Sequence, residues 1–234
     1  TGEPITMNSE VVEDAATVAR IAEAAEPLIE IRNKVVGTTS TVIEGSREIC
    51  RVSECEMGNL VADSHLDRVA DQGISIAILN GGGIRASIDV GDVTMGDVLT
   101  VLPFQNMVST MQLSGANVIA ALENGVSKVE EVAGRFPQVA GVRFTFDTSV
   151  GPNEGRVTEV LVANGDNWEP IDPDAMYGVV TNSYMRSGGD GYSVFANESV
   201  NAYDYGPNQE NVVADYMAAG GAYTPYTDGR ITQK

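Results

Sequence analysis

Residues Ile78 to Asp89 read ILNGGGIRASID, a pattern that indicates a buried strand of an α/β-type sheet followed by a glycine-rich loop. An apolar run ends at Asn80, three glycines follow, and Arg85 comes two positions after the last of them. Glycine lets the backbone take positive φ and lets a ligand approach closely. Open α/β sheets bind ligands outside the carboxyl ends of their strands. The stretch predicts a buried strand that leads into an anion or nucleotide contact. The alternative is a tight turn with a surface arginine.

Segments on both sides of this strand alternate between helical and strand patterns. Helical spacing appears in residues 57–73, 93–104, 115–129 and 211–221, with Ser114 as an N-cap. Residues 33–44 read as a strand, a bend and another strand, and further strand patterns appear in residues 74–80, 107–114, 139–147, 156–171 and 176–185. Asn164–Gly165 predicts a hairpin turn. Helices, hairpins and buried strands are therefore mixed, so the sequence predicts an α+β (mixed α/β) globular fold.

The N-terminal segment, residues 9–32, shows apolar residues at helical spacing with acidic residues early in the run. Pro27 lies late in this segment, where we expect it to kink the helix or start a second helical piece. A helix rich in alanine and glutamate ahead of the first strand indicates a connector to something upstream. An ordinary packed helix is the alternative.

Charge excludes one large class of partner. The chain of 234 residues has 33 acidic and 14 basic residues, a net charge of −19. Proteins that bind nucleic acid usually present a basic face, so we expect no nucleic-acid partner. No apolar run reaches the roughly 18 residues needed to span a bilayer, so we also expect no membrane segment.

The two cysteines bear on the compartment. Cys50 and Cys55 are separated by four residues, a spacing that can close a small disulfide loop if the backbone turns back on itself. Two free buried thiols are the alternative. A zinc site would need more ligands than these cysteines and His65, the single histidine, provide. We expect the disulfide, and with it an oxidising compartment. His65 itself lies in a helical segment without a cluster of partners, and we interpret it as structural or exposed.

Two glycine-rich stretches carry the candidate binding residues. NGGGIR ends on Arg85 and SGGDGY ends on Tyr192, while LPF supplies a second aromatic, Phe104. Neither stretch matches a known phosphate fingerprint. Two aromatic rings can hold a flat base between them, and each stacking contact is worth about 1–3 kcal/mol. Arginines suit the anionic end of such a ligand. These residues predict a nucleotide site without a metal centre.

Five motifs together resemble one known family. CRVSECEMGNLVAD, ILNGGGIRASID, VLPFQN, QVAGVRFTFD and SGGDGY occur in the same order as in the C-terminal domain of the 5'-nucleotidase and UDP-sugar hydrolase family. The resemblance runs from about residue 36 to 231. It implies a layered sandwich of helices and mixed sheets over residues 36–234, preceded by an interdomain linker helix over residues 1–35.

The resemblance also implies roles for individual residues. Arg51 and Arg85 are similar to the family arginines that engage the phosphate and ribose, and Asn80 to the asparagine that reaches the nucleoside. Phe104 and Tyr192 resemble the two aromatics that sandwich the base. We expect Gly82 and Gly83 to keep one wall of the pocket low. The family has an aspartate on the ribose hydroxyls a few residues after the second aromatic. Here that region contains Asn197 and Glu198, and either could bind the diol.

Three functions follow as hypotheses. By resemblance, the chain is the substrate-binding domain of a periplasmic or extracellular 5'-nucleotidase-type hydrolase that binds a nucleoside monophosphate or related nucleotide. An upstream metallophosphatase domain would hold two divalent metal ions, and this chain would need no cofactor of its own. The second hypothesis is a stand-alone nucleoside-binding module. The third, a complete enzyme with a metal-free mechanism, is disfavoured because one histidine and two cysteines provide no nucleophile–base set.

Overall fold

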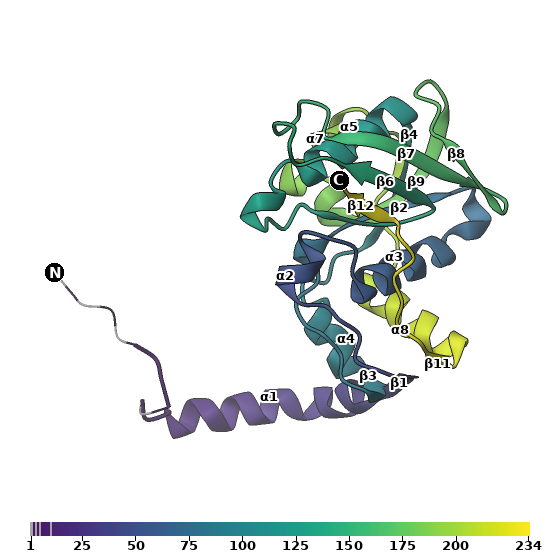
Figure 1. Ribbon diagram of the computed structural model, residues 1–234. Helices are drawn as coiled ribbons and strands as arrows, with labels where there is room; N and C mark the ends of the chain where they lie inside the picture. Colours follow the sequence, from purple (N-terminus) through teal and green to yellow (C-terminus); the bar gives the residue numbers. More distant parts are fainter. Residues whose placement is uncertain (1, 3, 5, 10) are drawn as a thin grey trace.

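The structure is a computed structural model that describes residues 2, 4, 6–9 and 11–234 (Figure 1). Its α-helices are α1 (Ala15–Asn33), α2 (Arg47–Cys50), α3 (Glu56–Arg68), α4 (Met95–Val101), α5 (Gly115–Val126), α6 (Ser183–Arg186), α7 (Ser193–Asn197) and α8 (Gln209–Gly220). Short 3-10 turns are η1 (Ala70–Gln72), η2 (Gly81–Gly83), η3 (Val129–Glu131) and η4 (Gly189–Gly191).

The strands form three separate sheets. The first has the order β11 (Ala222–Tyr223), β1 (Val35–Thr39), β3 (Gly91–Thr94). The second, central sheet has the order β10 (Val200–Tyr203), β4 (Val108–Ser114), β9 (Met176–Asn182), β2 (Ile76–Asn80), β5 (Pro137–Ala140). The third has the order β12 (Ile231–Gln233), β6 (Val142–Phe146), β7 (Val157–Asn164), β8 (Asn167–Pro170). Within the central sheet β2 and β9 run parallel, while the other neighbours are antiparallel, so the sheet is mixed.

The central sheet separates two apolar cores. Along β2, Ala77 and Leu79 join the core formed with α3, α4 and α8. Ile76 and Ile78 point to the opposite core, which is built with α5 and the third sheet. Successive side chains of a strand face opposite sides, and all five residues of β2 are buried. The predicted layered arrangement of helices and mixed sheets is therefore confirmed, and it is visible in Figure 1.

Local signals set several boundaries as the sequence predicted. The Ser114 hydroxyl accepts a hydrogen bond from the Asn117 backbone N–H at 3.2 Å, which makes it the N-cap of α5. β7 and β8 form a hairpin in which Asn164 pairs with Asn167, so the chain turns at the predicted Asn164–Gly165. Both features depend only on neighbouring residues.

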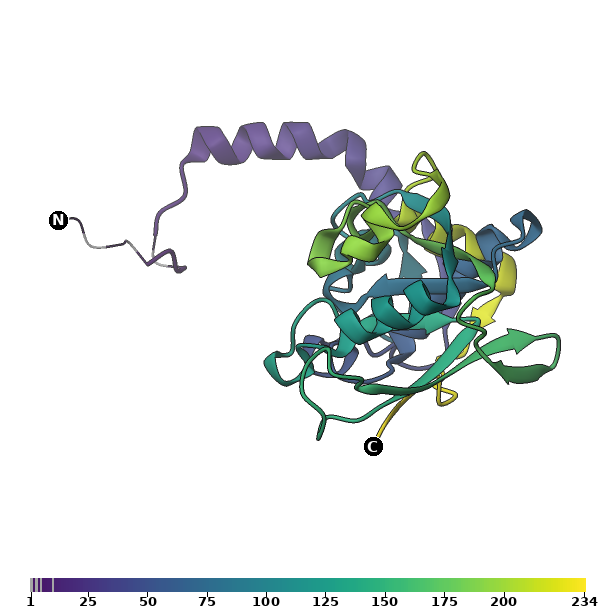
Figure 2. The same ribbon diagram turned by 90° about the horizontal axis from the view of Figure 1, so that it is seen from above.

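Helix α1 projects away from the rest of the molecule (Figures 1 and 2). None of its residues, all of which are described, is buried. It continues past Pro27 as one helix, so a second helical piece does not start at this proline. The backbone joins the body where Met95 N–H donates to the Lys34 carbonyl at 2.9 Å. Across the described part of the chain, no helix is long and apolar enough to cross a membrane.

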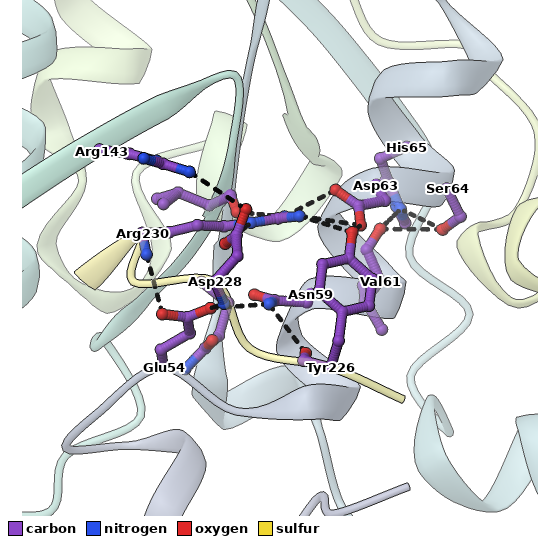
Figure 3. A network of polar contacts seen from close by, with 12 residues as sticks. Glu54, Asn59, Val61, Asp63, Ser64, His65, Arg143, Tyr226, Asp228 and Arg230 are labelled. Atoms are coloured by element: carbon purple, nitrogen blue, oxygen red, sulfur yellow. Dashed lines mark hydrogen bonds and ion pairs between the residues drawn. The ribbon is translucent and has the colours of Figure 1, made fainter. Parts of the chain in front are cut away.

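A buried arginine fastens the C-terminal segment to α3 (Figure 3). Arg230 is 7% exposed and donates to both carboxylate oxygens of Asp63, at 2.6 and 3.1 Å. The Glu54 carboxylate accepts the backbone N–H groups of Asp228 and Arg230, each at 2.8 Å. Glu54 lies between the two cysteines, so the C-terminal segment also holds the outer side of the Cys50–Cys55 loop.

Candidate functional site

A cavity of about 550 Å³ opens where the parallel strands β2 and β9 end. The side chains that follow these strands meet there, because the Asn182 amide donates to the Asn80 side-chain oxygen at 3.0 Å. The cavity therefore lies outside the carboxyl ends of two parallel strands, as expected from the sequence. It is lined by Arg51, Asn80, Gly82, Gly83, Arg85, Phe104, Asn106, Gly134, Tyr184 and Asp190.

The glycine run lets the backbone of this segment pack closely against neighbouring backbone. Residues 81–83 form the 3-10 turn η2, and no residue of this run has positive φ, contrary to one expectation from the sequence. A Cβ on Gly82 would lie 2.7 Å from the Cα of Gly134, which is closer than real Cβ atoms come. A Cβ on Gly81 would collide with the carbonyl oxygen of Cys50. Bare backbone thus packs against bare backbone, and this leaves the floor of the cavity low.

Asp190 is the centre of the polar network in the cavity. Its carboxylate accepts hydrogen bonds from the Asn80 amide at 2.8 Å and from the Tyr184 hydroxyl at 3.0 Å. Its backbone takes positive φ, 54°, and its N–H donates to the Tyr184 oxygen at 3.1 Å. The structure places the Asp190 carboxylate in the cavity lining. The Asn80 side chain, 5% exposed, is engaged with Asp190 and Asn182.

Two arginines line the cavity and form no ion pair with any residue that the structure describes. Arg51, 7% exposed, follows α2, and its buried Nε has no hydrogen-bond partner in the described part of the chain. Burial, with the nearby positive charges of Arg47 and Arg85, lowers the pKa of Arg51. The Arg85 guanidinium carbon lies 5.8 Å from the centre of the Phe104 ring. Among the described residues neither Arg51 nor Arg85 forms an ion pair. Two guanidinium groups that have no ion-pair partner among the described residues favour an anion in this part of the cavity.

The second aromatic of the cavity is Tyr184, so the predicted placement of Tyr192 is corrected. Tyr192 is fully buried, and its ring stacks on Phe195 at 4.9 Å between ring centroids. Its hydroxyl donates to the Arg135 carbonyl at 2.7 Å, and burial raises its pKa. Tyr184 and Phe104 are 44% and 54% exposed, and both line the cavity. The two aromatic rings that line the cavity are therefore Phe104 and Tyr184, in place of the expected Phe104 and Tyr192.

Tyr184 is presented by a short helix that starts where β9 ends. Asn182 caps α6, because its side-chain oxygen accepts the backbone N–H of Met185 at 2.9 Å. This cap turns the chain at the carboxyl end of β9 and leaves Tyr184 beside the cavity. Sequence reasoning missed this residue, although the same strand-end rule that selected Asn80 applies to the segment 176–185.

The candidate diol ligands lie elsewhere. Asn197 ends α7, Glu198 follows it, and both are exposed and absent from the cavity lining. The structure therefore places neither of them beside the residues named above. The carboxylate in the lining is that of Asp190.

The disulfide prediction is confirmed. Cys50 and Cys55 are bonded, with 5.2 Å between their Cα atoms, so the alternative of two free thiols is wrong. The bond closes the loop that carries Arg51 into the cavity. The disulfide and a cavity-lining arginine thus lie in the same short segment.

His65 is structural, as one of the two sequence interpretations held. It is fully buried in α3, and its Nδ1 donates to the Val61 carbonyl at 2.8 Å. Burial lowers the pKa of His65 to about 4, so the ring is neutral near pH 7. Within the described residues, no group of three or more histidine, cysteine, aspartate or glutamate side chains could hold a metal ion.

Comparisons with known proteins agree with this architecture. The family model of the 5'-nucleotidase C-terminal domain matches residues 35–197. The trifunctional nucleotide phosphoesterase protein YfkN of Bacillus subtilis is 41% identical over 210 residues, 88% of this chain and 14% of that protein. The 5'-nucleotidase of Bos taurus is 33% identical over 243 residues, 98% of this chain and 42% of that protein.

A solved structure gives the same result. The 5'-nucleotidase precursor from Thermus thermophilus superposes with a TM-score of 0.88 and 36% identity, covering 94% of this chain and 43% of that one. The chain spans less than half the length of each of these proteins. The fold and the family model nevertheless agree over most of this chain. It belongs to the family of 5'-nucleotidase C-terminal domains.

Proposed function

We propose that this domain binds a nucleoside monophosphate, or the equivalent part of a larger nucleotide, in the 550 Å³ cavity. It would do so as the substrate-binding domain of a 5'-nucleotidase-type phosphoric ester hydrolase. One observation carries the proposal. A single cavity brings together two exposed aromatic rings, a carboxylate and two arginines that have no ion-pair partner among the described residues.

The two rings suit a base. Phe104 and Tyr184 lie on segments 80 positions apart and expose their rings to the same cavity. A planar base between them would gain about 1–3 kcal/mol per stacking contact, whichever base it is. The proposal therefore leaves the identity of the base open.

The carboxylate suits the ribose diol. Each oxygen of Asp190 already accepts one hydrogen bond, from Asn80 or Tyr184, which fixes the direction of the group. An ionised carboxylate has about four acceptor sites, so capacity remains for two hydroxyl donors. Asp190 replaces Asn197 and Glu198 as our proposed ribose contact.

The arginines suit the phosphate. Arg51 and Arg85 provide donors in a part of the cavity where bare glycine backbone forms the floor. Guanidinium groups bind phosphate oxygens with charge-assisted, often bidentate hydrogen bonds. Gly82 and Gly83 would let the ribose phosphate lie close to the backbone.

Catalysis would require a second domain. The names of the relatives describe nucleotidases and phosphoesterases, and this chain spans only part of each of them. We propose that a metallophosphatase domain with two divalent metal ions lies upstream, and that residues 1–35, including the projecting helix α1, link the two. The disulfide supports a periplasmic or extracellular location, since such bonds persist in oxidising compartments.

Calorimetric titration of the 234-residue chain with adenosine, AMP, UMP and UDP-glucose tests the binding proposal. We expect AMP to bind, and to bind more tightly than adenosine. If none of the four ligands binds to folded protein, the proposal is wrong.

A phosphate-release assay separates the domain hypothesis from a complete enzyme. We expect the chain incubated with AMP and Mn²⁺, Zn²⁺ or Co²⁺ to release no phosphate above background, because a metal-dependent phosphatase centre needs several carboxylate and imidazole ligands. Turnover that persists through repurification would overturn this. A chain that binds adenosine and AMP equally would favour the alternative, a stand-alone nucleoside-binding module.

A further inference from the structure

The loop from Cys50 to Cys55 carries the positively charged Arg51 side chain in a buried position close to two other arginines. Arg51 is 7% exposed, and both Arg47 and Arg85 act on it as like charges. Its buried Nε has no hydrogen-bond partner among the residues that the structure describes. Burial and the like charges of Arg47 and Arg85 disfavour the charged form of Arg51, and the opposite charges of Asp190 and Glu48 offset this only in part. Something other than the arginine's own contacts must therefore fix the loop.

The side chain of Gln138 adds contacts to the loop backbone, beyond the closure by the disulfide and the contacts of Glu54. It extends from β5 and is fully buried. Its Nε2 donates to the carbonyl oxygens of Cys50 and Ser53, at 2.9 and 2.8 Å. Its Oε1 accepts the backbone N–H of Cys55 at 3.2 Å. One amide thus holds the loop backbone on both sides of Arg51 and uses both of its donors in doing so.

The surrounding backbone leaves room for this amide and for no larger group. A Cβ on Gly58, in α3, would collide with the Gln138 side-chain oxygen. The carbonyl of Cys50 is in turn pressed against Gly81, the first glycine of the run that forms the cavity floor. The amide, the loop and the glycine run therefore form one packed unit.

We propose that Gln138 is a positioning residue that fixes Arg51 against the phosphate of the bound nucleotide. This inference rests on the proposed function. Gln138 is absent from the cavity lining and does not touch the ligand itself. The amide acts through the backbone of residues 50–55 and sets where the Arg51 guanidinium points.

The proposal predicts an effect confined to the phosphate. Phe104, Tyr184 and Asp190 lie on other segments, and none of these described side chains bonds to Gln138. Without the amide, two carbonyls and one N–H of the loop lose their partners, and the loop backbone no longer holds Arg51 in place. The base and ribose contacts remain. A merely structural role for Gln138 would instead weaken all ligands together.

The test is a double-mutant cycle on the oxidised chain, read by calorimetry with adenosine and AMP. We expect Gln138→Met, which keeps the volume and removes the hydrogen bonds, to weaken AMP binding about tenfold, or about 1.4 kcal/mol. Adenosine binding should change less than about threefold. In an Arg51→Ala background, Gln138→Met should not lower the affinity for AMP any further. An equal loss for AMP in both backgrounds, or an equal loss for adenosine and AMP, overturns the proposal.

Controls separate this test from folding and from the proposed function. Val139→Ala changes the neighbouring residue of β5, buried in the opposite core, and should lower stability while leaving the AMP-to-adenosine ratio unchanged. If Gln138→Met does not fold, Gly58→Ala is the second variant, because its added methyl group displaces the same amide. It should reproduce the selective loss of affinity for AMP. An unchanged ratio of the AMP and adenosine affinities in this variant overturns the proposal. If Arg51→Ala itself has no effect on AMP, the proposed phosphate site fails, and the role of Gln138 fails with it.

Discussion

Replacing Tyr184 by alanine is the sharpest test of the cavity. Its ring is 44% exposed, and its hydroxyl both donates to the Asp190 carboxylate at 3.0 Å and accepts the Asp190 N–H at 3.1 Å. Burial, and then the charge of Asp190, raises the pKa of the Tyr184 phenol, so it stays protonated and able to donate near neutral pH. On our proposal the residue therefore provides a stacking face for the base and also orients Asp190, the proposed ribose ligand.

The two contributions can be separated. Loss of one stacking ring costs about 1–3 kcal/mol, or about 5- to 150-fold in affinity. We expect Tyr184→Ala to weaken adenosine, uridine and their monophosphates by a similar factor, because the ring meets only the base. Tyr184→Phe keeps the ring and removes the hydroxyl, and should cost about 0.5–1.5 kcal/mol, the net value of a typical hydrogen bond.

Tyr192→Phe is the matched control. It also removes one tyrosine hydroxyl, but from a fully buried ring that is bonded to the Arg135 carbonyl. An unsatisfied buried carbonyl costs about 1–3 kcal/mol of stability. We expect Tyr192→Phe to lower the free energy of unfolding and leave affinity unchanged. Calorimetry and urea denaturation measure the two quantities. Unchanged nucleoside affinity in folded Tyr184→Ala, with a loss in Tyr192→Phe, would refute our placement of the base.

Three further predictions concern charge and covalent closure. Arg85→Ala should weaken AMP by about 1.5–3 kcal/mol, the value of a hydrogen bond to a charged group, and adenosine by much less; equal losses measured by calorimetry would contradict a phosphate contact. Replacing both Cys50 and Cys55 by serine should lower the free energy of unfolding by about 2 kcal/mol, from the chain entropy of a short closed loop. The same change should weaken the binding of AMP more than that of adenosine. An unchanged ratio of the two affinities would show that the bond does not fix Arg51. His65, with its pKa lowered to about 4 in the folded state, binds more protons when unfolded, so stability should fall as pH drops from about 6.5 toward 4. The measurement is the free energy of unfolding of His65→Met and of the original chain as a function of pH, above pH 5. The variant should lack this dependence on pH, and an identical slope in both proteins would refute the prediction.

Features encoded by neighbouring residues could be predicted from the sequence. The buried strand β2 followed from an apolar run that ends in glycines, and the start of α5 followed from Ser114 as a cap. The pairing of Cys50 with Cys55 required only that the backbone turn back over four intervening residues. Each of these depends on contacts within one short segment.

Features that depend on distant partners could not be predicted in the same way. Tyr192 follows a glycine run, which suggested an exposed ligand contact. Gly188, Asp190 and Gly191 all take positive φ, and these reversals turn Tyr192 into the core and leave the earlier Tyr184 outside. The amide of Asn80 is used by Asp190, 110 positions later. A single sequence contains no signal for that pairing.

The joining of β2 to β9 has a consequence for how the protein folds. Asn80 and Asn182, which meet at the ends of these strands, are 102 positions apart. Parallel pairing over such a separation closes a long loop and is intrinsically slow. A folding intermediate without β9 would possess Phe104 and the arginines but lack Tyr184 and Asp190. On our proposal, nucleoside binding would therefore report the pairing of β9 with β2, and a fluorescent nucleoside analogue added during refolding would record when that pairing forms.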